Sequence, residues 1–468
     1  MTTLLRRAAP SDRFDRRLLA PMMVGTILNP VNTAIIAVAL TPIGIALGAP
    51  ASETVWLVSG LYLATAIGQP LVGRLVDVFG AKPLFLGGAV LVAAAGAIGL
   101  FAPESRESIW WLVAARVILG LGTCAGYPVA MHMIRAESER TGMASPAGIL
   151  TVLSVTTQTT AVIGPTLGGL LIGGWGWRAT FAVNIPLGLA SLLLGALFFP
   201  RRTGIEPAPH ERPRIDAVGI ALFAVTMLAF LVFLQNIRVD LLWMPVVGLA
   251  AGAAFLWWER GTDDPFIDVR VLSGSVPLML TFIRSLLTAT VSYTFVYGFT
   301  QWLEDGRGLS PTATGLILLP VFATGVVFAV AFGRRPEVVW KLLLGSTAQL
   351  AAGILVLFMT DSSPLWFLVL AMLILGIPQG LNNLAIQNSL YFQAEPARIA
   401  SSAGLLRTFF YLGAIVSSVV YGNVYGARAS TAGLHVLGWF VVAIAAVFLV
   451  ITVFDRSLAR IGRTPPTE

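Results

Sequence analysis

The sequence predicts an all-α polytopic membrane protein, on the basis of its composition, its long apolar runs and the distribution of its basic residues. Of the 468 residues, 56% are hydrophobic and only 11% are charged, whereas about a quarter of a soluble globular chain is charged. Mean hydropathy is +0.83. So few polar residues cannot cover a soluble surface, which nearly excludes a soluble enzyme, a nucleic-acid reader and a disordered protein.

Apolar runs long enough to cross a bilayer recur along the whole chain. A bilayer core needs about 20 apolar residues per helix, and a helix satisfies its own backbone in lipid. A β-barrel would show shorter, alternating segments. The first run is too long for the core of a cleavable signal peptide. We therefore predict fourteen spans, at 19–48, 54–77, 83–102, 108–134, 147–172, 180–199, 217–237, 241–259, 276–302, 312–332, 339–360, 364–390, 401–426 and 432–454.

The basic residues lie mostly on one side of this topology. With the N-terminus placed in the cytoplasm, the cytoplasmic segments hold 22 basic residues and the opposite loops hold five. Basic loops stay on the cytoplasmic side of a membrane, so we predict that both termini are cytoplasmic. This bias accounts for the net charge of +7 without a nucleic-acid partner.

The fourteen spans divide into six, two and six. We predict an N-terminal six-helix bundle at 1–200 and a linker at 201–270 that carries a transmembrane hairpin at about 217–259. A C-terminal bundle with a short cytoplasmic tail follows at 271–468. Charge bias does not separate fourteen spans from twelve with a surface hairpin, but the length and hydropathy of the pair favour fourteen.

The sequence at the end of span 2 reads G-R-L-V-D-V-F-G-A-K-P at residues 73–83. It resembles the G-x-L-A-D-R-x-G-R-K-P loop of the major facilitator superfamily. A glycine here allows a close helix approach, and Asp77 can accept hydrogen bonds from backbone N–H groups at a helix N-terminus. The resemblance implies that this helix is the one starting near Ser401. It also implies conformational roles for Gly73, Asp77, Gly80 and Lys82.

Span 5 contains G-P-T-L-G-G at residues 164–169, which resembles a signature of exporters in the same superfamily. Proline kinks a helix, and glycines four residues apart let a neighbouring helix pack closely. The entry to span 6, at 177–188, and D-A-V-G at 216–219 are similar to the branch of drug:H⁺ antiporters with fourteen spans. The resemblance covers nearly the whole chain. It implies conformational roles for Gly164, Pro165, Gly168 and Gly169.

The departure that matters most is in span 1, where this branch typically has an aspartate and this chain has Asn32. Each of the 23 acidic residues is predicted to lie in a loop or at a helix end. A proton-coupled antiporter would then need another carrier, such as His132, an acid at a helix end, or the substrate. His132 is also suited to packing at the inner end of span 4, so the coupling ion stays open.

The resemblance implies that spans 1, 4, 9 and 12 line a central cavity. At about 100° per residue, the polar side chains of each of these spans gather on one face, and span 13 carries a similar stripe. Such residues avoid lipid, although polar groups in spans also serve as hydrogen bonds between helices. The candidate cavity residues are Asn29, Asn32, Thr33, Arg116, Thr123, Tyr127, Arg284, Thr288, Gln379, Asn383, Gln387, Arg407 and Tyr411.

The three arginines of this set carry the substrate hypothesis, because an embedded charge without an embedded acid is costly. Guanidinium groups match carboxylates and phosphates. We therefore predict an exporter of amphipathic small molecules, such as drugs or natural products, that accepts anionic or zwitterionic groups and works by alternating access. Alternatives are a transporter of lipid-like molecules or metabolites that is not coupled to protons through a span-1 acid, and a transport-dead membrane sensor.

No nucleophile–base pair or metal-ligand cluster is apparent in the sequence, so an enzyme is not expected. No phosphate-binding glycine-rich loop appears, so ATP is not expected to drive transport. We predict no cofactor and no metal, with the lipid bilayer and a small amphipathic substrate as partners and a monomer as the oligomeric state. The location predicted is the cytoplasmic (inner) membrane of a bacterium.

Overall fold

The computed structural model describes residues 14–49, 51–54, 56–142, 146–201, 203, 215–235, 237–263, 265–267, 275–309, 311–425 and 429–461. The regular secondary structure in these ranges is helical, and they contain no strand. Thirteen helices in them are long and apolar enough to cross a membrane. The protein is thus an all-helical polytopic membrane protein, as its composition predicts.

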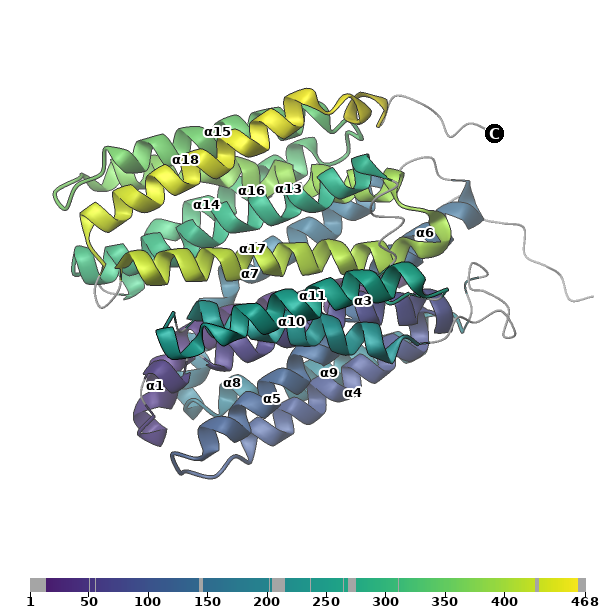
Figure 1. Cartoon of the computed structure of the whole chain (residues 1–468), viewed down its shortest axis with the longest axis horizontal. Helices are drawn as coiled ribbons and strands as arrows, with labels where there is room; N and C mark the ends of the chain where they lie inside the picture. The colour runs from purple at the N-terminus through teal and green to yellow at the C-terminus, as the bar shows by residue number, and fades with distance from the viewer. Residues whose placement is uncertain are drawn as a thin grey trace, which may run out of the picture.

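The N-terminal helices pack on one another in one half of the molecule (Figure 1). Within this half α1 packs against α7, α4 against α9, and α3 against α5. The elements are η1 (Arg16–Leu18), α1 (Leu19–Leu47), α2 (Ala51–Thr54), α3 (Trp56–Phe79), α4 (Ala81–Leu100), α5 (Ser108–Thr123), α6 (Gly126–Thr141), α7 (Ala147–Trp175), α8 (Ala179–Ala182) and α9 (Asn184–Phe198).

The C-terminal helices form the other half, in which α14 packs on α16, α13 on α17, and α15 on both α16 and α18. Two segments of π-helix, η4 and η5, continue the line of α13. The elements are α13 (Val276–Tyr293), η4 (Thr294–Phe299), η5 (Trp302–Gly306), α14 (Pro311–Phe332), α15 (Val339–Leu357), α16 (Leu365–Gln393), η6 (Pro396–Arg398), α17 (Ile399–Tyr425), α18 (Thr431–Phe454) and η7 (Arg456–Arg460).

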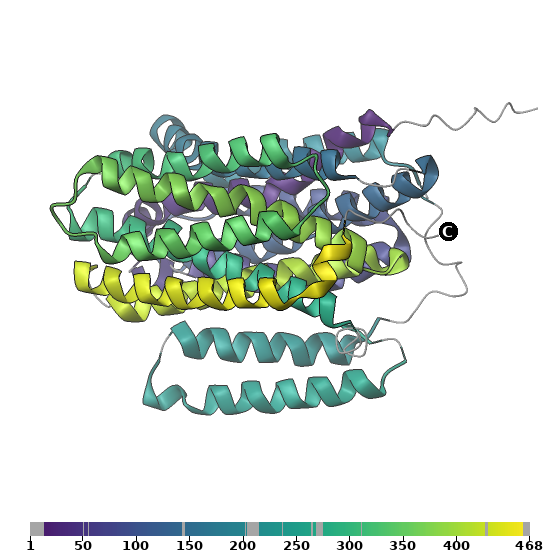
Figure 2. The same cartoon turned by 90° about the horizontal axis from the view of Figure 1, so that it is seen from above.

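Between the halves in sequence lies a helical hairpin of α10 (Ala217–Gln235) and α11 (Trp243–Gly261), joined through η3 (Val239–Leu241). Figure 2 shows it outside the two bundles, and α10 contacts both α3 and α17. Asp216 caps α10 by accepting from the backbone N–H of Gly219 at 2.8 Å and also accepts from the Trp258 indole of α11 at 3.0 Å. One carboxylate therefore ties the two helices of the hairpin together.

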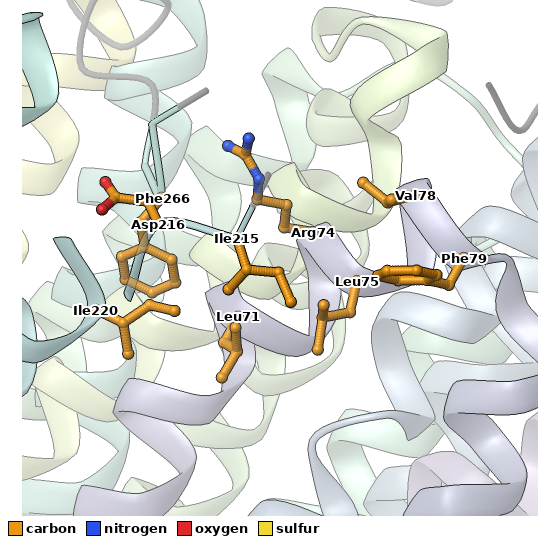
Figure 3. Close-up of a pocket in the computed structure, with 9 residues that line it drawn as sticks. All are labelled: Leu71, Arg74, Leu75, Val78, Phe79, Ile215, Asp216, Ile220 and Phe266. Carbon is orange, nitrogen blue, oxygen red and sulfur yellow. The ribbon is translucent and has the colours of Figure 1, made fainter. Parts of the chain in front are cut away.

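A pocket lies between the end of α3 and the start of the hairpin (Figure 3). Its walls are mostly apolar, and its charged side chains are Arg74 and Asp216. This contact places the hairpin against the same helix end that carries the residue 73–83 motif. The lining residues are Leu71, Arg74, Leu75, Val78, Phe79, Ile215, Asp216, Ile220 and Phe266.

The observed helices follow the predicted spans with three local differences. Predicted span 6 is divided into α8 and α9 at Val183. Predicted span 4 is two helices, because α5 ends at Thr123 and α6 begins at Gly126. Span 9 changes from α- to π-helix after Tyr293. The predicted span 147–172 is the 29-residue helix α7, which is not among the thirteen candidates. Fourteen spans and the orientation of the termini therefore stay predictions.

Candidate functional site

The two halves meet through close backbone contacts where α3 ends and α17 begins, which we call the Asp77 end. A Cβ atom added to Gly73 would lie 2.4 Å from the Ala400 carbonyl oxygen, and one added to Gly404 would lie 2.2 Å from the Gln69 carbonyl oxygen. A side chain on either glycine would hold the helices apart. Both positions therefore require glycine for this degree of closure.

Asp77 joins the halves by hydrogen bonds at the same place. Its Oδ1 accepts from the Ala400 backbone N–H at 3.1 Å, and its Oδ2 accepts from the Ser401 N–H at 2.7 Å and the Ser401 hydroxyl at 2.5 Å. These donors form the N-terminus of α17, where the helix dipole favours a negative charge. This is the helix that the motif led us to expect.

The other motif residues of this loop hold the start of α4. Gly80 has φ of 89°, a left-handed conformation that costs glycine little. The Lys82 ammonium donates to the carbonyl groups of Ala196 and Phe199, both at 2.7 Å. A cation there favourably meets the C-terminal carbonyls of α9. Gly80 and Lys82 thus fix the geometry of the loop within the N-terminal half.

In span 5, two of the four motif residues contact α1 closely. A Cβ on Gly164 would lie 2.3 Å from Cβ of Ala34, and one on Gly168 would lie 2.6 Å from the Val38 side chain. Gly169 has no neighbour within 4 Å. The backbone of Pro165 lies within α7, but its side chain lies outside what the structure describes.

Six of the predicted cavity residues come together between the halves. Tyr127 of α6 belongs to the N-terminal half, and the other five belong to α13, α16 and α17. The cavity has a volume of about 20 Å³, room for about one water molecule. The cavity is therefore too small for an amphipathic substrate in this conformation. Its lining residues are Tyr127, Ser285, Thr288, Gln379, Asn383, Ile386, Gln387, Leu406, Arg407 and Phe410.

Arg407 is the cation of this cavity. Its guanidinium lies 4.1 Å from the ring centroid of Tyr127 and 5.6 Å from that of Phe410. Both contacts are with aromatic rings, and within the described residues its N–H groups make no ion pair and no hydrogen bond. An arginine presented in this way can bind a carboxylate or phosphate through its fork of donors.

Four further predicted residues form a hydrogen-bonded group that crosses between the halves. Asn29 of α1 donates to Thr123 at 3.1 Å and accepts from the Tyr411 hydroxyl of α17 at 2.8 Å. Thr33 donates to the same Asn29 oxygen at 3.4 Å. Asn29 therefore connects α5 of its own half with α17 of the other.

The side chains of the remaining three predicted residues each bind a partner within their own half of the molecule. Asn32 donates to the Asn184 side chain at 2.6 Å, and Arg116 donates to the Leu57 carbonyl at 2.9 Å. Arg284 is 1% exposed and pairs with Asp455 at 2.8 Å. The structure thus gives Arg284 an acid partner just past the end of α18, whereas the sequence suggested an unpaired charge. It brings neither Arg284 nor Arg116 to the walls of the cavity.

A tyrosine cluster that was not predicted from the sequence joins the halves farther along α3. The Tyr62 and Tyr297 hydroxyls lie 3.1 Å apart, and the Tyr62 ring also contacts Tyr293 and Tyr411. Tyr293 and Tyr297 are four residues apart, a spacing that pairs side chains on a helix. That spacing was a usable signal, but nothing in the sequence related either residue to Tyr62.

Comparisons with known proteins agree on the family. The model of the Major Facilitator Superfamily matches residues 22–418. The uncharacterised MFS-type transporter YwoD of Bacillus subtilis is 32% identical over 90% of this chain and 92% of its own length. The multidrug resistance protein Stp of Mycobacterium tuberculosis is 28% identical over 80% of this chain and 69% of its own.

The fold is also found among solved structures. The human organic anion transporter MFSD10 (TETRAN) superposes with a TM-score of 0.64 at 17% identity, over 95% of this chain and all of that one. At this identity the likeness concerns the fold alone.

Proposed function

The chain belongs to the Major Facilitator Superfamily, and on that premise we propose that it is a secondary exporter of amphipathic small molecules that carry an anionic or zwitterionic group. Members of this family are transporters and not enzymes. The observation that carries the substrate proposal is the Arg407 guanidinium, which lines the cavity between the halves, lies over the rings of Tyr127 and Phe410 and makes no ion pair with a described residue.

Alternating access is supported by the contacts between the halves on both sides of this cavity. Asp77 binds the start of α17 on one side, and the Tyr62–Tyr297 hydroxyl pair lies farther along α3 on the other. Because the cavity holds about one water molecule, a substrate could enter only after one set of contacts separates. Rocking of the halves about a central site would provide that opening.

Export, rather than uptake, is supported by the relatives whose printed names are multidrug resistance proteins. In this proposal the chain has fourteen spans, with α7 as the fourteenth, and sits in a bacterial cytoplasmic membrane with both termini inside. The Asp77 end then faces the cytoplasm. We further propose that the protein acts as a monomer and that Asn32 stands where drug:H⁺ antiporters have an acid.

A thermal-shift experiment on the purified protein tests the substrate class. Matched amphiphiles that share one apolar body and differ only in an anionic, zwitterionic or cationic head group are compared. We expect the anionic and zwitterionic members to raise the melting temperature of the wild-type protein. Arg407→Gln is expected to lose this shift, since a neutral amide cannot replace the charge.

Arg106→Gln is the matched control, because Arg106 is an exposed arginine that pairs with Glu53 on the surface. It should keep the wild-type shift. Stabilisation by the cationic member alone, or an anion shift that survives in Arg407→Gln, would refute the proposed anion site. Accumulation of the stabilising compound in inside-out vesicles, whose outer surface is the cytoplasmic face of the membrane, then tests the direction.

A further inference from the structure

His132 of α6 lies beside the hydrogen bonds that join the halves at the Asp77 end. Its Nδ1 is 3.6 Å from Oδ1 of Asp77, the same oxygen that accepts from the Ala400 N–H. Its Nε2 is 2.9 Å from the hydroxyl of Thr203. The residue is 1% exposed. The ring is therefore held between the end of α3 and the segment that follows α9.

Most other charged side chains on the elements around His132 bind other partners or are exposed. On α6 itself they form the ion pairs Arg135–Glu139 and Glu137–Arg140. Lys82 of α4 binds carbonyl groups of α9, and Arg74 of α3 lines the pocket at the hairpin (Figure 3). Asp15, Arg16 and Arg17 before α1, and Glu395 and Arg398 before α17, are exposed. Asp77 places a carboxylate 3.6 Å from Nδ1 of the ring.

We propose that His132 is a proton-binding site whose protonation opens the Asp77 end. This inference rests on the alternating access of the proposed function and names a coupling site for it. Asn32, which occupies the position of the missing span-1 acid, binds Asn184 and offers no group that exchanges protons near neutral pH. A histidine changes charge between about pH 5 and about pH 8.

The proton changes the balance of interactions at Asp77. With neutral imidazole, the full negative charge of the carboxylate acts on the positive N-terminus of α17. When His132 takes one proton from water, both ring nitrogens become donors, directed at Asp77 and Thr203. The imidazolium then competes with the Ala400 N–H for Oδ1 and offsets the carboxylate charge. The attraction between the halves falls, and the population open at this end rises.

Distance measurement between spin labels tests this directly. Labels are placed at Glu139 and Glu395, two exposed residues on opposite halves near this end, after the buried Cys124 is replaced by alanine. When the pH falls from about 8 to about 5, we expect the ratio of open to closed molecules to rise about tenfold. A tenfold change corresponds to a difference of one pKa unit for His132 between the open and the closed conformation. Asp77→Asn should be open at both pH values.

His132→Gln should stay closed and lose the pH response, since glutamine keeps a polar side chain but binds no proton. The double variant His210→Gln/His435→Gln leaves His132 as the only histidine and should respond like wild type. A wild-type distribution that does not change with pH, or a response that survives in His132→Gln, overturns the proton site. The spin-label measurement contains no amphiphile. A negative result there would therefore reject the proton site without bearing on the anion site, which the thermal-shift experiment tests.

Discussion

Replacing Gly404 by alanine is expected to shift the protein toward a conformation open at the Asp77 end. The new Cβ would lie 2.2 Å from the Gln69 carbonyl oxygen and 2.9 Å from its carbon. Both are backbone atoms of α3, so no side chain can turn away to make room. To restore an ordinary van der Waals distance, the two helices must separate by about 1 Å. The alanine side chain therefore overpacks the interface between α3 and α17.

The size of the expected shift in Gly404→Ala depends on which conformation carries the steric strain. Overpacking a close contact costs about 1–3 kcal/mol, and here the cost falls on the closed conformation, because opening separates α3 from α17. The ratio of open to closed molecules should therefore rise by about 5–150-fold, the range that such energies produce. The spin-label pair at Glu139 and Glu395 reports this ratio at a fixed, alkaline pH.

Gly422→Ala is the matched control on the same helix, because a Cβ there meets nothing within 4 Å. It should leave the distance distribution unchanged, while alanine slightly favours the helix. If Gly404→Ala and Gly422→Ala give the same distribution as wild type, and Gly404→Ala melts at the wild-type temperature, then close approach at this glycine does not set the closure of the halves.

Two further substitutions test the interior of each half. Arg284→Met should lower the free energy of unfolding by about 3–5 kcal/mol, because Asp455 is left buried without its partner. In thermal unfolding, the double variant Arg284→Met/Asp455→Asn should recover most of this loss. Equal melting temperatures for the single and the double variant would contradict the reasoning. Gly164→Ala should cost about 1–3 kcal/mol, because its Cβ would lie 2.3 Å from that of Ala34. Gly169→Ala has no such neighbour and should be neutral by the same measurement, so a similar loss in both would point to a cause other than contact with α1.

The sequence by itself determined the features that depend on one helix or one local motif. Span positions follow from hydropathy over about 20 residues, and the observed helices match them closely. The 73–83 motif, through its resemblance, identified the helix that Asp77 binds, and the structure has that contact. Helical periodicity also placed Thr288 on one face of α13 and Gln379, Asn383 and Gln387 on one face of α16, and all four line the cavity.

Only the tertiary structure decided what each embedded cation contacts. Periodicity relates residues within a helix, but the rotation of one helix against another depends on packing between segments far apart in the chain. Arg284 is paired with an acid 171 residues away, whereas Arg407 lies against aromatic rings and faces the cavity. The proximity of His132 to Asp77 and of Tyr62 to Tyr297 arises in the same way. No local pattern encodes such pairs, since each forms only when separate helices come together.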